Sequence, residues 1–295
     1  MFRFVAALSI LVIAVSQPTT LAAQTAGVTD AERQVVSETK PFSEWTDAEK
    51  EDYLLNAPIV DRIAIDVGIT GTDRVTMDDG TAQHDAQSQT VNERVTFMRF
   101  EDGRTEQGFT DCYCYNIAAY RLDRLIGLNM VPVSVPRRDL GQDAAITWWV
   151  DDYLMMEADR LEDGTSVPRP LEWARDVGAA MVFRQLVYDT DPNLTNWMYS
   201  GDYRMWIIDF GRAFRTHKEL RSFEDLPLPN SIPRRVYDAM KSLTRELLDE
   251  TFEDLDLITG TQKDAILARR DLIIEHFDAL IADPNRSESM VLRGD

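Results

Sequence analysis

Alternation of apolar and polar positions marks the first half of the chain as rich in strands. Apolar and β-branched residues alternate with polar ones in four segments, which short turns rich in Gly, Asp and Thr separate. The predicted strands are residues 59–69, 74–77, 82–91 and 94–100, followed later by two apolar runs, 130–136 and 144–150. This pattern predicts a sheet in the first half of the chain.

Helical spacing of apolar residues appears once in this half and dominates the second half. Apolar residues recur every three to four positions from 113 to 126, and Gly127 follows where a helix is expected to end. Thr46 and Glu49 have the spacing of a capping box, which predicts a helix at 44–56. The later predicted helices are 171–188, 233–243, 244–252 and 261–281, interrupted by a short strand-like run at 204–210.

The change of pattern near residue 160 predicts an α+β protein with two lobes. Residues 43–159 are the expected strand-rich lobe with one embedded helix, and residues 160–285 the expected helical lobe. Polar residues 24–42 are predicted to be a linker, and residues 286–295 a frayed tail. A chain of 295 residues is long enough for one large domain or for two lobes that share a cleft.

The N-terminus has the pattern of an export signal. Arg3 precedes an apolar run from Phe4 to Val15, and small residues follow at 14–16 and 21–23. The run is too short to cross about 30 Å of hydrocarbon as a helix, so residues 1–23 are predicted to be a cleaved signal peptide, with an uncleaved anchor as the alternative. We therefore expect an exported protein, periplasmic or extracellular, with no stable membrane span after cleavage.

Composition and cysteine content narrow the range of partners. The net charge of −20 argues against a nucleic-acid partner, because clustered Lys and Arg bind phosphate backbones. A nucleotide remains compatible, since it needs only a local pocket. The two cysteines, Cys112 and Cys114, would point about 200° apart on a helix, so we expect them to be unbonded, half-buried residues at a helix start.

The segment from 188 to 215 carries the candidate chemistry, and three interpretations compete for it. A calcium loop requires Gly and Glu at its sixth and twelfth positions, where this chain has Leu194 and Ser200, so that interpretation is excluded. An ordinary turn rich in Asp and Asn is the second interpretation. The third is a phosphotransfer site, because Asp191 and Asn196 are five positions apart and Asp209 follows an apolar strand.

The third interpretation gains support from a family resemblance. The block NIAAYRLDRLIGLNMVPVSVPR at 116–137, together with DTDPNLTN and IIDFGRAF, resembles the atypical kinase-like superfamily over roughly residues 60 to 280. This group includes the Golgi casein kinase and the four-jointed secretory kinases, with more distant similarity to phosphatidylinositol kinases and HipA toxins. The resemblance implies a two-lobed protein-kinase-like fold with ATP and Mg²⁺ or Mn²⁺ in the cleft. It implies Asp191 as the catalytic base and Asn196 and Asp209 as metal ligands.

The strand-rich lobe departs from the kinase pattern. Gln89 stands where the resemblance predicts a Lys that holds the phosphates, and Asn116 stands where it predicts the Glu partner of that Lys. A Gln–Asn pair can share hydrogen bonds but neutralises no charge. Alternatively, both are ordinary polar residues. Trp149 is a candidate for the adenine pocket, although packing within a buried strand is the alternative role.

Three further features have open roles. The Gly68–Gly71 turn is a candidate phosphate cover or a plain turn, and Arg212 and Arg215 are candidates for the missing positive charge or for surface salt bridges.

The expected function is that of an ATP phosphotransferase acting on a hydroxyl of a protein, glycan or small molecule. The alternative is a pseudokinase that serves as a nucleotide-binding or protein-binding scaffold.

Overall fold

The computed structural model describes residues 40–65, 72–100, 103, 105–222, 224, 226–256 and 258–294, and these belong to one compact unit. The predicted signal peptide at 1–23, most of the predicted linker and the Gly68–Gly71 turn lie outside the described residues. Among the described helices, none is long and apolar enough to cross a membrane.

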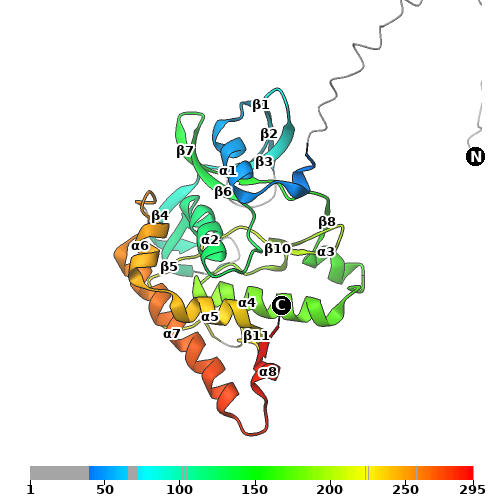
Figure 1. Ribbon diagram of the computed structural model, residues 1–295. Coiled ribbons are helices and arrows are strands. Elements are labelled where there is room, and N and C mark those ends of the chain that lie inside the picture. Colours follow the sequence, from blue (N-terminus) through cyan, green and yellow to red (C-terminus); the bar gives the residue numbers. More distant parts are fainter. Residues whose placement is uncertain are drawn as a thin grey trace, which may run out of the picture. The chain divides into compact units, whose positions relative to one another are not determined.

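A five-stranded antiparallel sheet forms the centre of the first lobe, as the alternating pattern predicts (Figure 1). Its order is β1-β2-β3-β7-β6. The strands are β1 (Ile59–Ile65), β2 (Thr72–Asp78), β3 (Gln83–Gln89), β6 (Ser134–Asp139) and β7 (Gln142–Trp148). A short 3-10 helix η1 (Phe42–Glu44) and the helix α1 (Asp47–Asn56) precede it, and the predicted capping box at Thr46 and Glu49 is present.

Helix α2 (Cys114–Leu125) is buried along most of its length and packs against β6 and β7. Its buried residues are Cys114, Tyr115, Asn116, Ile117, Ala118, Ala119, Tyr120, Leu122 and Asp123. Burial on more than one face explains why the sequence shows helical spacing without a clean polar side. The helix therefore lies between the sheet and the second lobe, where Figure 1 also draws it.

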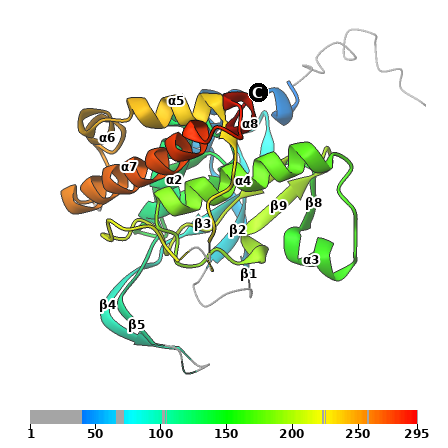
Figure 2. The ribbon, with the colours of Figure 1, turned by 90° about the horizontal axis from the view of Figure 1, so that it is seen from below.

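A separate hairpin, β4 (Asn92–Arg99) and β5 (Thr105–Cys112), stands beside the sheet. Figure 2 shows it extending away from the other strands. The sequence predicts β4 but not β5, because the segment TEQGFTDC is mostly polar and its strand character depends on pairing with β4. The end of β5 leads directly into α2.

The second lobe is mainly helical, as predicted, around a small antiparallel sheet of order β10-β9-β8. These strands are β8 (Tyr153–Met156), β9 (Trp197–Ser200) and β10 (Met205–Ile207). The helices are α3 (Glu157–Glu162), α4 (Pro170–Leu186), η2 (Leu194–Asn196), α5 (Arg234–Ser242), α6 (Arg245–Thr251) and α7 (Gly260–Ala282). Helix α7 contacts α4, α5 and α6 and so organises this lobe.

Two expectations are wrong. The tail at 286–295 does not simply fray: α8 (Glu288–Val291) is followed by β12 (Leu292–Arg293), which pairs in parallel with β11 (Ile232–Pro233) and buries Val291 and Leu292. Cys112 and Cys114 are joined in a disulfide. The helical spacing argument fails because Cys112 ends β5 and only Cys114 belongs to α2.

Candidate active site

A buried ion pair at the end of helix α4 fixes the loop that carries Asp191. Arg184 near the end of α4 pairs with Asp189, and both side chains are fully buried. Arg184 Nη2 also donates to the Asn196 carbonyl at 3.1 Å, while Asp189 Oδ1 accepts from the Asp191 amide at 2.9 Å. The pair thus holds both ends of the segment from Asp189 to Asn196 in place.

Asp191, Asn196 and Asp209 are brought together by short backbone connections. The Asn196 side-chain Nδ2 donates to the Asp191 carbonyl at 3.1 Å. The Ile208 amide, one residue before Asp209, donates to the Asn196 carbonyl at 3.0 Å. The order Asp–Asn–Asp in the sequence therefore corresponds to one constellation at the junction of the loop and the strand β10.

Asp209 occupies a crowded and strained position. Its φ is +57°, a left-handed conformation that Asp tolerates better than most residues but that still costs free energy. The residue is exposed to solvent on one side. The protein atoms on its other side desolvate the carboxylate and raise the pKa of Asp209 to about 6, and the nearby charges of Asp189 and Asp191 raise it further.

Gln89 and Asn116 hydrogen-bond to each other, Asn116 Nδ2 donating to Gln89 Oε1. Asn116 Oδ1 in turn accepts from the amide of Phe210 at 2.7 Å, and Phe210 is fully buried. The two side chains connect β3 through α2 to the residue after Asp209. This chain of bonds fixes the Asp-Phe-Gly segment without introducing a charge.

The two adjacent tryptophans have different surroundings. Trp148 lies among aromatic rings, with the His84 ring stacked at 3.7 Å. Gln89 pairs with Ala145 in the β3–β7 register, and side chains alternate along a strand, so Ala145, Thr147 and Trp149 point to the same side of the sheet as Gln89. Arg74 lies over the Trp149 ring at 4.6 Å.

The three-dimensional arrangement is similar to that of two solved structures. A structure of Fam20 from hydra, solved with a sugar, has a TM-score of 0.61 at 13% identity and covers 84% of this chain and 92% of its own. The Golgi casein kinase with Mn and ADP bound has a TM-score of 0.57 at 14% identity. The match covers 83% of this chain and 78% of the Golgi casein kinase chain. No protein-family model matches the sequence, and a comparison with curated proteins finds no match.

The fold is that of the atypical kinases. The identities of 13% and 14% establish the fold and no more. The roles of individual residues remain predictions.

Arg212 and Arg215, which follow the Asp-Phe-Gly segment, form ion pairs with acidic side chains. Arg212 Nη2 and Arg215 Nη2 each lie 2.6 Å from a carboxylate oxygen of Glu106 on β5. Arg212 Nη1 also lies 3.3 Å from Asp191 Oδ2. Their side chains are only 16% and 8% exposed, so these are not surface salt bridges. They join the hairpin to the loop that carries Asp191.

Asp111 is a candidate that the sequence alone does not reveal. It is 5% exposed, and its Oδ1 atom has no hydrogen-bond partner. Burial raises the pKa of Asp111 to about 6, with a further contribution from Asp209. Without the unpredicted strand β5, nothing in the sequence places Asp111 near Asp209. The only sequence feature that could have drawn attention to Asp111 is its place directly before the Cys112–Cys114 pair, at the start of α2.

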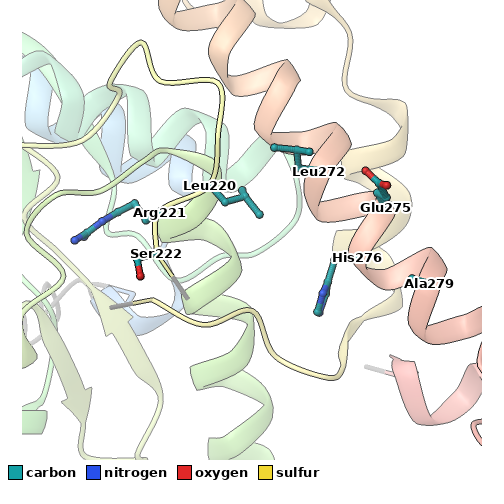
Figure 3. A pocket seen from close by; sticks show the side chains of 7 residues that line it. All are labelled: Leu220, Arg221, Ser222, Leu272, Glu275, His276 and Ala279. Atoms are coloured by element: carbon teal, nitrogen blue, oxygen red, sulfur yellow. The ribbon is translucent and has the colours of Figure 1, made fainter. Parts of the chain in front are cut away.

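One cavity lies on the second lobe and another between that lobe and strand β5, and neither is lined by Asp191, Asn196 or Asp209. The larger, about 500 Å³, lies between residues 220–222 and helix α7 (Figure 3). Leu220 and Leu272 make much of it apolar, while His276 approaches it from α7 (Figure 3). The smaller, about 400 Å³, is polar and reaches Thr190, next to Asp191.

Proposed function

We propose that this chain is an exported, metal-dependent phosphotransferase that moves the γ-phosphoryl group of ATP to a hydroxyl acceptor. The observation that carries the proposal is the constellation of Asp191, Asn196 and Asp209, joined through the hydrogen bonds of Asn196 and Ile208. A scaffold has no chemical need for all three groups. The fold, shared with the Golgi casein kinase that was solved with Mn and ADP, supports the same proposal.

The residues present fit a hard divalent cation. Carboxylate and amide oxygens are the donors that Mg²⁺ and Mn²⁺ prefer. Asp209 supplies a solvent-accessible carboxylate, and Asn196 keeps its amide oxygen because its nitrogen is bonded to the Asp191 carbonyl. Within the described ranges, no group of three or more His, Cys, Asp or Glu side chains is arranged to hold a metal ion by itself, so an amide oxygen such as that of Asn196 would have to contribute. When bound, the cation would neutralise phosphate charge as the phosphoryl group moves.

The protein's own residues would perform the remaining steps. Asp191 is partly exposed and positioned to accept the proton of an acceptor hydroxyl, whose oxygen then forms the new bond to the γ-phosphorus as the bond to ADP breaks. Arg212 lies against the same carboxylate and orients it. The polar cavity beside Thr190 offers a route for the acceptor.

Export rests on two observations. The first is the signal-like segment at 1–23. The second is the Cys112–Cys114 disulfide, because disulfides persist in oxidising compartments and are rare in the cytosol. Both support a periplasmic or extracellular location.

The second candidate function is a pseudokinase scaffold, and the Gln89–Asn116 pair favours it. Replacement of a Lys–Glu pair by two amides removes positive charge that would stabilise the transferred phosphoryl group, a contribution of several kcal/mol in active sites. The two functions share a nucleotide site and differ in turnover.

Turnover of ATP in the presence of Mn²⁺ tests the proposal. Asp191→Ala should lower the rate of ADP formation by roughly 10²–10⁴-fold while leaving nucleotide affinity unchanged, because the base acts only on the proton of the acceptor. Asp209→Ala should abolish the turnover that Mn²⁺ supports, because a metal ligand is lost. Natural Mn²⁺-stimulated turnover in Asp209→Ala would defeat this mechanism.

A further inference from the structure

Asp111 is held beside the Asp-Phe-Gly segment by its neighbours in the chain. The next residue, Cys112, donates its amide to the Gly211 carbonyl at 2.9 Å. The Cys112–Cys114 disulfide closes the junction between β5 and α2 directly afterwards. Asp111 is therefore fixed by backbone contacts and not by any bond of its own Oδ1 atom.

Gly211 leaves room for this carboxylate. A methyl group at position 211 would overlap Asp111 Oδ1, and it would lie 3.6 Å from Asp209 Oδ1. The φ of Gly211 is outside the left-handed region, so the glycine is needed for close approach and not for backbone conformation. Asp111 and Asp209 thus border the same small volume above Gly211.

The charges around this volume are unbalanced. Arg212 and Arg215 are near Asp111 but are bonded to Glu106 and, for Arg212, to Asp191. A buried carboxylate oxygen without a hydrogen bond is costly, and a second carboxylate beside it increases the cost. A bound cation is the partner that would satisfy both.

We propose that Asp111 is a ligand of the divalent cation, paired with Asp209 across Gly211. The carboxylates of Asp111 and Asp209 would hold the cation beside Gly211, and the cation would neutralise their charges. The inference rests on the proposed function, since it places a new ligand in the metal site proposed there.

The test is direct Mn²⁺ binding, measured by the loss of the electron paramagnetic resonance signal of free aqueous Mn²⁺, with and without ADP. Asp111→Asn keeps the shape and removes the charge, and it should weaken Mn²⁺ binding at least about tenfold. Asp123→Asn is the matched control, because Asp123 is also buried with a raised pKa but belongs to α2 and the loop after it. The control should bind Mn²⁺ like the natural chain.

Urea unfolding without metal gives a second readout. Asp111→Asn should be at least as stable as the natural chain, because it ends the burial of an unpaired charge. Reduced Mn²⁺ affinity together with undiminished stability would separate a ligand from a structural residue. A structural residue would show the reverse combination, lower stability with unchanged Mn²⁺ affinity, and that result would overturn the inference.

A second variant and the natural chain complete the design. Gly211→Ala places a methyl group against Asp111 Oδ1 and should also weaken Mn²⁺ binding, even if Asp111→Asn does not fold. Natural affinity in Gly211→Ala would contradict the inference alone. Failure of the natural chain to bind Mn²⁺ even with ADP would instead overturn the proposed function as well.

Discussion

Asp123 is a buried carboxylate that fixes the turn after helix α2, away from Asp111 and Asp209. Its Oδ1 accepts from the amides of Met130 and Val131 at 2.9 and 3.3 Å, and its carbonyl accepts from the Leu128 amide at 2.9 Å. Arg124 pairs with its second oxygen. These bonds hold the turn between α2 and β6, the part of the sequence that most resembles the kinase-like superfamily.

The pKa of Asp123 predicts a pH dependence of stability. Burial raises this pKa to about 6, so between about pH 4 and pH 6 the folded chain binds the proton more tightly than the unfolded chain. The free energy of unfolding contributed by Asp123 should therefore fall as the pH rises through this window. Asp123→Asn removes the titration.

Urea unfolding of both proteins at several pH values measures the effect. The free energy of unfolding of the natural chain, minus that of Asp123→Asn, should decrease by about 2 kcal/mol between pH 4 and pH 7. A difference that stays constant or increases over this range would show that Asp123 does not titrate with a raised pKa.

Single residues differ in how far the sequence reveals them. Asp191, Asn196 and Asp209 lie close together along the chain, so their spacing alone singles them out. The sequence does not show that Asp111 lies beside Gly211. This position follows only from the β4–β5 register and from the contact of β5 with Gly211. Gln89 and Asn116 are hydrogen-bonded to each other, while their correspondence to the Lys and Glu positions and their functional roles stay predictions.

Among the elements, the loop from Asp189 to Asn196 depends on the Arg184–Asp189 pair. Arg184→Met should destabilise the fold by about 3–5 kcal/mol, because Asp189 would be left buried without its partner. Arg184→Met with Asp189→Leu should recover part of this loss. Chemical unfolding measures both.

Helix α6 provides the control for that prediction. Arg245 pairs with Asp249 one turn later, and both side chains are exposed. Arg245→Met should cost less than about 1 kcal/mol. Similar losses for Arg184→Met and Arg245→Met would mean that the buried pair contributes no more than a surface pair.

The β4–β5 hairpin is attached to the site through Glu106. Glu106→Gln removes the charge shared by Arg212 and Arg215 and should cost about 1–3 kcal/mol. Amide hydrogen exchange should become faster in β5 and at residues 211–215. Glu93→Gln, an exposed position on β4, is the control and should leave exchange unchanged. Unaltered exchange in Glu106→Gln would show that other contacts hold the hairpin.

The elements found from the sequence are those with a local signal. The helices α1, α2, α4, α5, α6 and α7 have periodic apolar positions or caps, and each agrees with its prediction to within a few residues. The strands β5, β8 and β9 are short or mostly polar and acquire their form from pairing. Tail residues pair with β11, a partner that no local pattern identifies.

At the scale of the whole molecule, acidic charge dominates, and the site must gather positive charge locally to hold a nucleotide. Gln89→Lys with Asn116→Glu would introduce the charged pair of a conventional kinase. If the chain is a phosphotransferase, this double variant should lower turnover, because it disturbs the bond from Asn116 to Phe210. If the chain is a scaffold, the double variant should bind the nucleotide more tightly than the natural chain, as measured by calorimetry.

The central claim, a metal-dependent nucleotide site formed by Asp191, Asn196 and Asp209, is tested most directly by thermal unfolding with ATP, with and without Mn²⁺. A ligand that binds only the folded chain should stabilise it by about 2.7 kcal/mol at a hundredfold excess over the dissociation constant. We predict a clear upward shift of the Tm that requires both ATP and Mn²⁺ and that Asp209→Ala loses. The absence of any shift with ATP or other nucleotides at millimolar concentration, with or without Mn²⁺, would contradict the account.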